Sequence, residues 1–300
     1  MKYKVHYPYI TFYIQKPISI EELFHQFHLS KKTIHLLKQN KDYSVNQRFV
    51  SAQTILLKGD RLTIKGFQSD DHMYSPEYQD IDIVYEDEFI LIVNKPPFIN
   101  IYPDDQHKTH SLCHQVSAYY QQAGYDIPVR YIHRLDYETS GLVLFCKCAF
   151  VQPLLDYQLS IKNIQRYYLA VVMGEIKDHD IHLIDKPIGR DRHSNRMRVS
   201  TTGKNAQTYY QCLAYRQGLS LVKCSLKTGR KHQIRVHMAS LHHPLLGDKL
   251  YHQPSSQINH QALHAYQMTF EHPITNKKMT ITCHPPQDML KIIHSIDSTW

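Results

Sequence analysis

Long apolar runs and paired cysteines are both missing from this sequence of 300 residues. No stretch approaches the roughly 18 consecutive apolar residues that would span a membrane. The amino-terminal segment MKYKVHYPYITFYIQKP lacks the apolar core that a secretory signal needs. The 6 cysteines follow no disulfide framework. Reduced thiols and the lack of a signal favour a cytoplasmic protein that does not associate with membranes.

Several catalytic signatures are also absent. His232 and His237 lie five positions apart with no Glu between them, so none of the 22 histidines forms a two-histidine zinc helix. Gly203-Lys204 lacks the rest of a phosphate loop, and no G-x-S-x-G elbow occurs. Cys146-Lys147-Cys148 has no second cysteine pair to complete a zinc site. These absences argue against metal-dependent hydrolases and serine hydrolases, and we predict no metal site.

The chain is basic, and its charge is distributed unevenly. The formal net charge is +8, and residues 1–70 hold 11 Lys and Arg against 5 Asp and Glu, a net of +6 that leaves +2 for the rest. Basic surface raises the local concentration of phosphates. The distribution favours a basic binding module joined to a nearly neutral body. Many basic proteins bind no nucleic acid, so charge alone does not identify the partner.

The first 66 residues read as a small α/β unit. Residues 18–29 place apolar side chains at helical spacing. Ser30 is expected to cap a second helix, from whose surface Lys31, Lys32 and Lys38 project into water. Strand-like segments follow at residues 43–45, 55–57 and 62–64. The alternative is a basic helical hairpin whose lysines are simply solvated.

Residues 67–80 are polar and partly acidic, and we interpret them as a linker to a body at 81–300. The body begins with β patterns, and two alternating segments at 208–216 and 219–226 are separated by a turn at Gln217-Gly218. Other predicted elements are a buried strand at 89–93, a helix at 111–122, a strand at 166–175 and a helix that ends near Leu241.

Asp136 is the most informative position. It lies in the segment HRLDYETSG, which is rich in turn residues and flanked by the apolar stretches Tyr131-Ile132 and 142–145. Short apolar runs of this kind predict buried strands, so Asp136 is expected on a loop between two core strands. Loops held by a rigid scaffold often carry reactive groups. Taken alone, an aspartate that caps its own turn is the simpler interpretation.

Three other segments bear on chemistry. The strand at 166–175 begins with adjacent tyrosines whose side chains must point to opposite faces. The stretch 186–204 has 6 Lys and Arg and a single acidic residue. The stretch 227–237, KTGRKHQIRVH, is a basic turn that leads into a helix. Core tyrosines, a solvated loop and a charged helix start are the simpler interpretations of the three segments, each considered separately.

In this order and spacing, the segments resemble the RluA-type pseudouridine synthases, which modify uridines in ribosomal and transfer RNA. The resemblance covers essentially the whole chain. It rests on HRLDYETSG, Arg166-Tyr167-Tyr168-Leu169-Ala170, the strand from Gly203 to Tyr209, TGRKHQIRVH, His243-Pro244, Gly247-Asp248 and Leu263-His264-Ala265. The first 66 residues resemble a small RNA-binding domain of a ribosomal small-subunit protein, through Leu29-Ser30-Lys31-Lys32, Val45-Asn46 and Lys58-Gly59-Asp60.

The resemblance implies an α+β catalytic domain around a mixed, largely antiparallel sheet, no cofactor, and an RNA partner. It implies catalytic roles for Asp136 as the carboxylate, Tyr168 as the tyrosine that meets the base, and Arg230 as the partner of Asp136. The residues predicted to bind substrate are Lys95, Arg134, Leu135, His232, Gln233 and Arg235. Those predicted to contact RNA phosphates are Lys31, Lys32, Lys38, Arg190, Arg192, Arg196 and Arg198. We expect a monomer.

The chain departs from the family pattern in a few places. After Asn94-Lys95-Pro96 the family usually has a small residue, a Gly and then a His-Pro pair, whereas this chain has Pro97, Phe98 and Tyr102-Pro103. Arg166 replaces the common Lys. These changes bear on substrate fit more than on activity. The rival interpretation is an inactive RNA-binding or ribosome-assembly protein on the same fold, and it is disfavoured because binding alone does not require the carboxylate of Asp136.

Overall fold

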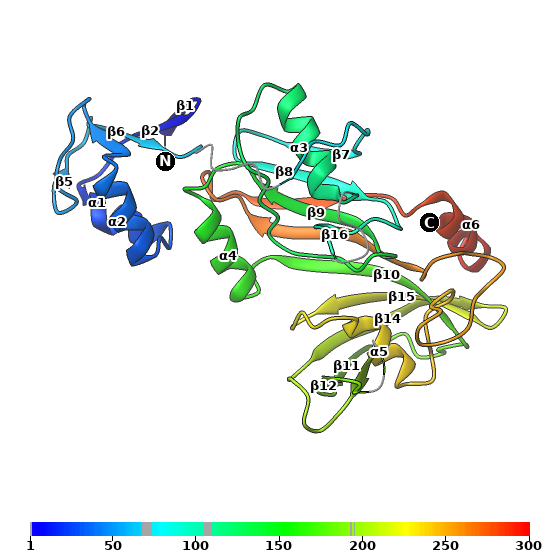
Figure 1. Ribbon diagram of the computed structural model, residues 1–300. Coiled ribbons are helices and arrows are strands. Elements are labelled where there is room, and N and C mark those ends of the chain that lie inside the picture. The colour runs from blue at the N-terminus through cyan, green and yellow to red at the C-terminus, as the bar shows by residue number, and fades with distance from the viewer. Residues whose placement is uncertain (1, 68–73, 105–109, 193, 195) are drawn as a thin grey trace.

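The described residues fold around two main sheets, one in a small amino-terminal unit and one in a larger body, and each part also has a two-stranded sheet (Figure 1). The computed structural model describes residues 2–67, 74–104, 110–192, 194 and 196–300. None of the described helices has the length and apolar character that a membrane crossing requires.

The amino-terminal unit combines an antiparallel sheet with two helices. Its sheet has the order β1-β2-β6-β4, and apolar side chains from one face of β2 and β6 pack on the helices. The N-cap predicted at Ser30 is confirmed, because its hydroxyl accepts a hydrogen bond from the Thr33 amide. The elements are β1 (Lys2–His6), β2 (Tyr9–Tyr13), β3 (Ile18–Ser19), α1 (Ile20–Gln26), α2 (Lys31–Gln39), β4 (Tyr43–Val45), β5 (Ile55–Leu56) and β6 (Arg61–Lys65).

Two features of this unit differ from the expectation. The first helix begins at Ile20 rather than at residue 18, because Ile18–Ser19 pairs with β5 and Ser19 then caps the helix. The strands β1 and β2 were not predicted. Their sequence alternates, but tyrosines occupy several positions and serve equally on a buried or an exposed face.

An aromatic contact joins the amino-terminal unit to the body. Phe27 packs on Phe150 with ring centroids 4.6 Å apart, and the His28 ring stacks on Tyr157 at 3.6 Å. Tyr157 lies on α4 (Gln152–Ser160), which Figure 1 shows between the blue unit and the main sheet. The end of the predicted linker also packs on the body, because the Ser117 hydroxyl of α3 (Leu112–Gln122) donates to the Tyr74 carbonyl.

The body is built on a nine-stranded sheet with the order β11-β14-β15-β10-β16-β9-β8-β7, and β17 pairs with β16. One pairing within it is parallel, between β16 and β9, and the other named pairings are antiparallel. The mixed, largely antiparallel sheet and the α+β class are therefore confirmed. The strands are β7 (Ile83–Glu86), β8 (Ile90–Lys95), β9 (Ser140–Cys146), β10 (Gln165–Met173), β11 (Ile181–Asp185), β12 (Ile188–Arg190), β13 (Met197–Val199), β14 (Gln207–Arg216), β15 (Leu219–Leu226), β16 (Leu263–Glu271) and β17 (Lys278–Thr282).

The predicted hairpin between β14 and β15 is confirmed. Gln217 and Gly218 both have positive φ, 53° and 75°, as the tight turn between twisted strands requires. The strands predicted at 89–93 and 166–175 and the helix at 111–122 are present as β8, β10 and α3, with ends shifted by a few residues. The remaining helices are α5 (Gln233–Ala239), two residues shorter than expected, and α6 (Gln287–Ile296).

Candidate active site

A pocket of about 530 Å³ opens beside the ends of β10 and β15. Asp136, Tyr168 and Arg230, which lie up to 94 positions apart (230 − 136), all line it. Within the described part of the chain, it also takes its walls from the loop before β9 and the turn before α5. The three residues singled out from the sequence therefore share one cavity.

The loop that carries Asp136 is fixed by its neighbours on both sides. Before it, Tyr131 forms a single bridge to Phe145 of β9, which corrects the expectation of a full strand there. After it, the Thr139 amide donates to the Asp136 carbonyl at 3.0 Å, closing a turn. Ser140 and Gly141 then pair with His264 and Ala265 as the parallel contact of the sheet.

The backbone at Gly141 explains why the TSG segment ends in glycine. Its φ is 116°, and a Cβ at this position would overlap the Ala265 backbone. The Ser140 hydroxyl hydrogen-bonds with His264 Nδ1 at 2.9 Å. Two motifs 124 positions apart, TSG and the segment Leu263-His264-Ala265, thus hold each other and fix the base of the Asp136 loop.

Arg235 is the cationic partner of Asp136. Its Nη1 lies 3.5 Å from Asp136 Oδ2, while Nε and Nη2 donate to the two carboxylate oxygens of Asp248 at 2.8 and 2.7 Å. The prediction that Arg230 pairs with Asp136 is not what the structure has: the Arg230 Nε donates to the Asn205 carbonyl at 2.9 Å. Arg235 points inward because it lies on the buried face of α5, whereas Arg230 lies on the exposed turn before that helix.

His232 is a neutral neighbour of the carboxylate. Burial lowers the pKa of His232 to about 4, although the Asp136 carboxylate acts in the opposite direction. Its Nε2 lies 4.0 Å from Asp136 Oδ2, and its Nδ1 hydrogen-bonds with the Tyr251 hydroxyl at 2.9 Å. The residue has a left-handed backbone (φ 55°) at the start of α5, which directs the ring into the pocket.

Tyr168 is the buried one of the two adjacent tyrosines of β10, as the alternation of a strand requires. Burial raises the pKa of the Tyr168 phenol, with Arg166 opposing the shift and the Asp136 carboxylate adding to it. The phenol is therefore protonated at neutral pH and can donate a hydrogen bond into the pocket.

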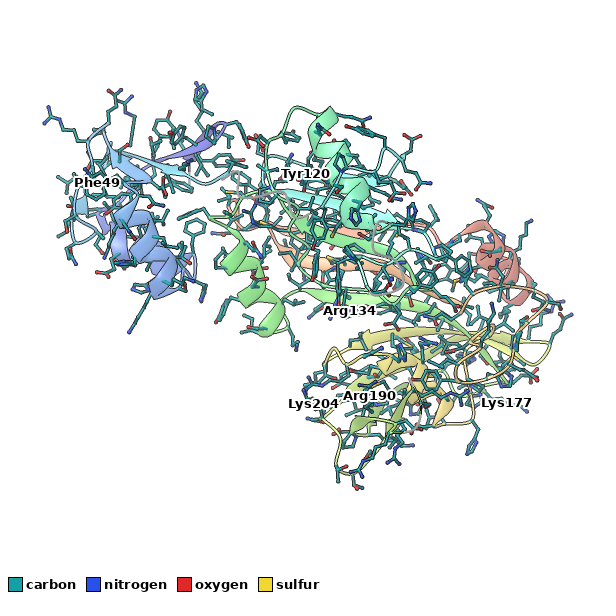
Figure 2. All side chains as sticks on the ribbon, viewed as in Figure 1. Phe49, Tyr120, Arg134, Lys177, Arg190 and Lys204 are labelled. Carbon is teal, nitrogen blue, oxygen red and sulfur yellow. The ribbon has the colours of Figure 1, made fainter. Side chains whose placement is uncertain are left out.

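Arg134 and Leu135 also line the pocket, as predicted for residues that bind substrate. Leu135 is buried and supplies apolar wall, whereas Arg134 is exposed at the opening. The Arg134 guanidinium carbon lies 5.2 Å from the centroid of the Tyr102 ring. Figure 2 shows Arg134 near the middle of the molecule, and Arg190 and Lys204 on the part formed by β11 to β15.

Gln233 lines the pocket but directs its hydrogen bonds to the protein. Its Oε1 accepts from the Thr228 hydroxyl at 2.8 Å and from the Arg230 amide at 2.9 Å. Its Nε2 donates to the Gln207 carbonyl and to the Thr208 hydroxyl, both at 2.9 Å. The side chain therefore shapes the turn that carries Arg230, rather than offering free donors to a substrate.

Lys95 does not lie in the pocket, which corrects its prediction as a residue that binds substrate. It is completely buried, and its Nζ donates to the carbonyls of Pro96, Ile99 and Tyr137 at 2.9, 2.8 and 3.1 Å. Burial lowers the pKa of Lys95 to about 7, and the Asp136 carboxylate opposes this shift. The lysine ties the loop after β8 to the residue that follows Asp136.

The basic residues predicted to contact RNA lie on two surfaces. Lys31 and Lys32 are exposed on α2, and Lys38 is partly covered and lies 4.0 Å from Glu21. Arg190, Arg192, Arg196 and Arg198 are all exposed on or beside the hairpin of β12 and β13.

Asp248 and Tyr251 are supporting residues that the sequence reasoning did not assign to the site. Asp248 is completely buried and holds Arg235 in a bidentate pair, and Tyr251 contacts both Arg235 and His232. The available signal was the Gly247-Asp248 motif, since a buried acidic residue needs a cationic partner.

Comparison with known proteins identifies the family of the chain. Residues 89–240 match the RNA pseudouridylate synthase family, and residues 11–62 match the RluD ribosomal pseudouridine synthase N-terminal domain. The chain belongs to the RNA pseudouridine synthases. One relative, the uncharacterized RNA pseudouridine synthase YhcT of Bacillus subtilis, is 40% identical over 263 residues, covering 87% of each chain.

Other members of the family give the same result. Ribosomal large subunit pseudouridine synthase D of Vibrio cholerae is 31% identical over 292 residues, covering 91% of this chain and 88% of the relative. The solved structure of human RNA pseudouridylate synthase domain containing 1 superposes with a TM-score of 0.60 at 23% identity, covering 76% of this chain and 91% of that one. This last likeness supports the fold.

Proposed function

We propose that this RNA pseudouridine synthase converts a uridine of ribosomal or transfer RNA to pseudouridine, with Asp136 as the catalytic carboxylate. The observation that carries the proposal is the single carboxylate that the described residues place on the wall of the pocket, 3.5 Å from a buried guanidinium. The names of the relatives, several of which refer to the ribosomal large subunit, favour ribosomal RNA.

The reaction breaks the bond between uracil nitrogen and the ribose, turns the base, and joins ring carbon 5 to the sugar. Carbon 5 loses its proton to solvent, and the released ring nitrogen gains one, so the product is an isomer of the substrate. Asp136 acts at the nucleotide as nucleophile or as a stabilising charge. Arg235 orients the carboxylate, because a planar, permanent cation can contact Asp136 while Asp248 holds its other edge. The neutral His232 adds no competing charge at the same oxygen.

The target uridine must leave its base stack to enter the pocket, at a cost of about a few kcal/mol. We propose that Tyr168 packs against the flipped base and offers its phenol for hydrogen bonding or proton transfer. Arg134 fills the space that the base vacates or contacts the backbone beside it. Arg230, at the exposed edge of the pocket, binds a phosphate of the same strand.

We further propose that residues 1–66 form a separate RNA-binding domain, that 67–80 link it to the catalytic domain at 81–300, and that the enzyme is a cytoplasmic monomer. The basic hairpin of β12 and β13 and the exposed lysines of α2 bind RNA phosphates outside the pocket. The reaction neither oxidises the substrate nor imports a group, so it requires no cofactor.

The decisive test is Asp136→Asn, which keeps the shape of the side chain and removes its charge. Total RNA from cells that lack this protein is the substrate, and pseudouridine is mapped after incubation. The wild type should form pseudouridine at one or a few sites, and Asp136→Asn should lower the rate by at least about 10⁴-fold, the scale of losing a principal catalytic group. Its RNA affinity should stay unchanged.

The matched control is Glu138→Gln, two residues away on the same loop and absent from the pocket lining. It should retain the wild-type rate. Full activity in excess chelator is also expected. If the wild type forms no pseudouridine on any undermodified RNA yet binds it well, the chain is instead an RNA-binding protein on this fold.

A further inference from the structure

Tyr102, on the loop between β8 and α3, contacts both Tyr131 and Arg134, and these three side chains are called the stack; Arg134 lines the pocket. The Tyr102 ring stacks on Tyr131, with centroids 5.3 Å apart and planes 18° from parallel. Tyr102 also contacts Arg134: the guanidinium carbon lies 5.2 Å from the centroid of the Tyr102 ring, and Arg134 Nη1 donates to the Tyr102 hydroxyl. Arg134 is thus held by both the ring and the hydroxyl of one side chain.

Both tyrosines of the stack are anchored to regular structure. The Tyr131 backbone bridges to β9, and the next amide, of Ile132, donates to the Leu144 carbonyl at 2.9 Å. Immediately before Tyr102, the Ile101 carbonyl accepts from the Cys113 amide at 2.9 Å, and the Ile101 side chain is buried. The stack therefore extends from the main sheet and the start of α3 to the guanidinium.

An exposed arginine would otherwise sample many rotamers at the opening of the pocket. Part of its rotamer entropy must be lost each time it makes a defined contact with RNA. A cation–π contact favours the held rotamer, and a hydrogen bond from a charged donor adds to this preference. Tyr102 can therefore offset this entropic cost before the substrate arrives.

We propose that Tyr102 is a positioning residue for the pseudouridylation reaction: it holds the Arg134 guanidinium at the opening of the pocket, ready for the nucleotide that enters. The inference rests on the proposed role of Arg134 at the displaced uridine. Tyr102 itself touches neither the base nor the sugar.

The test is a double-mutant cycle with Tyr102→Ala, Arg134→Ala and the double variant, together with Tyr102→Phe. The substrate is undermodified large-subunit ribosomal RNA carrying tritium at uridine carbon 5, and tritium release is measured in single turnovers. Tyr102→Ala should lower the rate per RNA by about tenfold, on the scale of one cation–π contact plus a charged hydrogen bond. Tyr102→Phe should lower it by about threefold, because the ring contact remains.

In the Arg134→Ala background, Tyr102→Ala should lower the rate no further, because a residue that acts through Arg134 has no effect once Arg134 is gone. Tyr215→Ala, at a partly exposed tyrosine on β14, is the control and should match the wild type. Thermal unfolding of each variant reports any loss of fold. A reduction of equal size in both backgrounds, or no reduction with Tyr102→Ala, overturns the inference.

A second readout needs no catalysis. Equilibrium affinity for the same RNA is measured with the four members of the cycle placed in the Asp136→Asn background. Coupling in affinity without tritium release from the wild type would refute the proposed function and keep the positioning role. Tritium release without coupling in either readout would keep the function and refute the positioning role.

Discussion

Arg235, the buried arginine of the pocket, and the arginines of the β12–β13 hairpin are the same residue type in opposite surroundings. Arg235 has an 8% exposed side chain and directs its donors to two carboxylates, whereas Arg190, Arg192, Arg196 and Arg198 are exposed. A buried charge is tolerated only where its partners are already in place, so Arg235 has a fixed position from which it can orient Asp136. Charges in water act at a distance and are screened by salt, so the exposed arginines of the hairpin can attract RNA. One region therefore positions the carboxylate, and the other captures the RNA.

The largest effect on stability is expected when the same Arg→Gln substitution is compared between the two regions. Arg235→Gln leaves Asp248 buried without its cation, and the free energy of unfolding should fall by about 3–5 kcal/mol. Arg198→Gln, the matched variant on the exposed hairpin, should change it by less than about 0.5 kcal/mol. Denaturant unfolding of both variants measures the difference. Equal effects would show that the buried pair has no special role in the fold.

The pH dependence of stability distinguishes buried from exposed histidines in the same way. Burial lowers the pKa of His232 and of His264 to about 4, whereas the unfolded value is near 6.5. Between these pH values the unfolded chain binds more protons than the folded chain, so stability should rise as pH increases from about 4 to 6.5 and then level off. His232→Gln should reduce this slope, corresponding to up to about 3 kcal/mol over the window.

Denaturant midpoints measured at half-unit pH intervals give the slope. His252→Gln, at an exposed position on the loop after α5, is the control and should leave the slope of the wild type unchanged. A slope that His232→Gln does not alter would mean that this ring gains no stability from being neutral in the pocket.

The hairpin arginines should control RNA capture rather than the chemical step. Replacing all four with Gln should make the dependence of RNA affinity on salt shallower, by about 0.7–0.9 in logarithmic slope for each phosphate that the protein no longer neutralises. The single-turnover rate at saturating RNA should not change. Filter binding at several salt concentrations measures the slope, and Arg216→Gln at the exposed end of β14 is the comparison. A fall in the single-turnover rate at saturating RNA would show that the hairpin arginines also take part in positioning the substrate.

The smallest effect concerns Phe98, which lies on the loop that Lys95 ties to the Asp136 segment. Phe98 has a left-handed backbone (φ 65°), which glycine adopts freely and which costs other residues about 1–2 kcal/mol. Phe98→Ala should therefore be less stable than Phe98→Gly by about 1 kcal/mol, since both lose the ring contacts with Tyr137 and His260 but only alanine keeps the strain. Denaturant unfolding compares the two variants, and equal stabilities would place the strain elsewhere.

Phe98 also shows how far sequence alone reaches. On sequence alone, Phe98 was related to substrate fit, and its positive φ was not predicted. Local signals did give the Ser30 cap and the Gln217-Gly218 turn, because each depends on residues that are neighbours in the chain. Motif order was enough to bring Asp136, Tyr168 and Arg230 to one pocket.

What the sequence could not provide depends on direction and on distant partners. Arg230 and Arg235 lie on one short stretch, and only the turn of α5 decides which of them faces Asp136. Lys95 looked accessible to substrate, yet three carbonyls converge on it from two loops. The strand β2 pairs with β6, which lies more than 40 residues further along the chain, and β1 pairs in turn with β2.

The parallel contact between β9 and β16 has a consequence for when the enzyme becomes competent. Gly141 pairs with Lys95 of β8 on one side, but Ser140 and Gly141 make their parallel contact with His264 and Ala265 on the other. The second side of the base of the Asp136 loop is therefore completed only after that late segment has emerged from the ribosome and docked. A nascent chain whose basic amino-terminal unit is already exposed can bind RNA well before it can modify a uridine. Synthesis itself thus separates the first encounter with RNA from the ability to modify it.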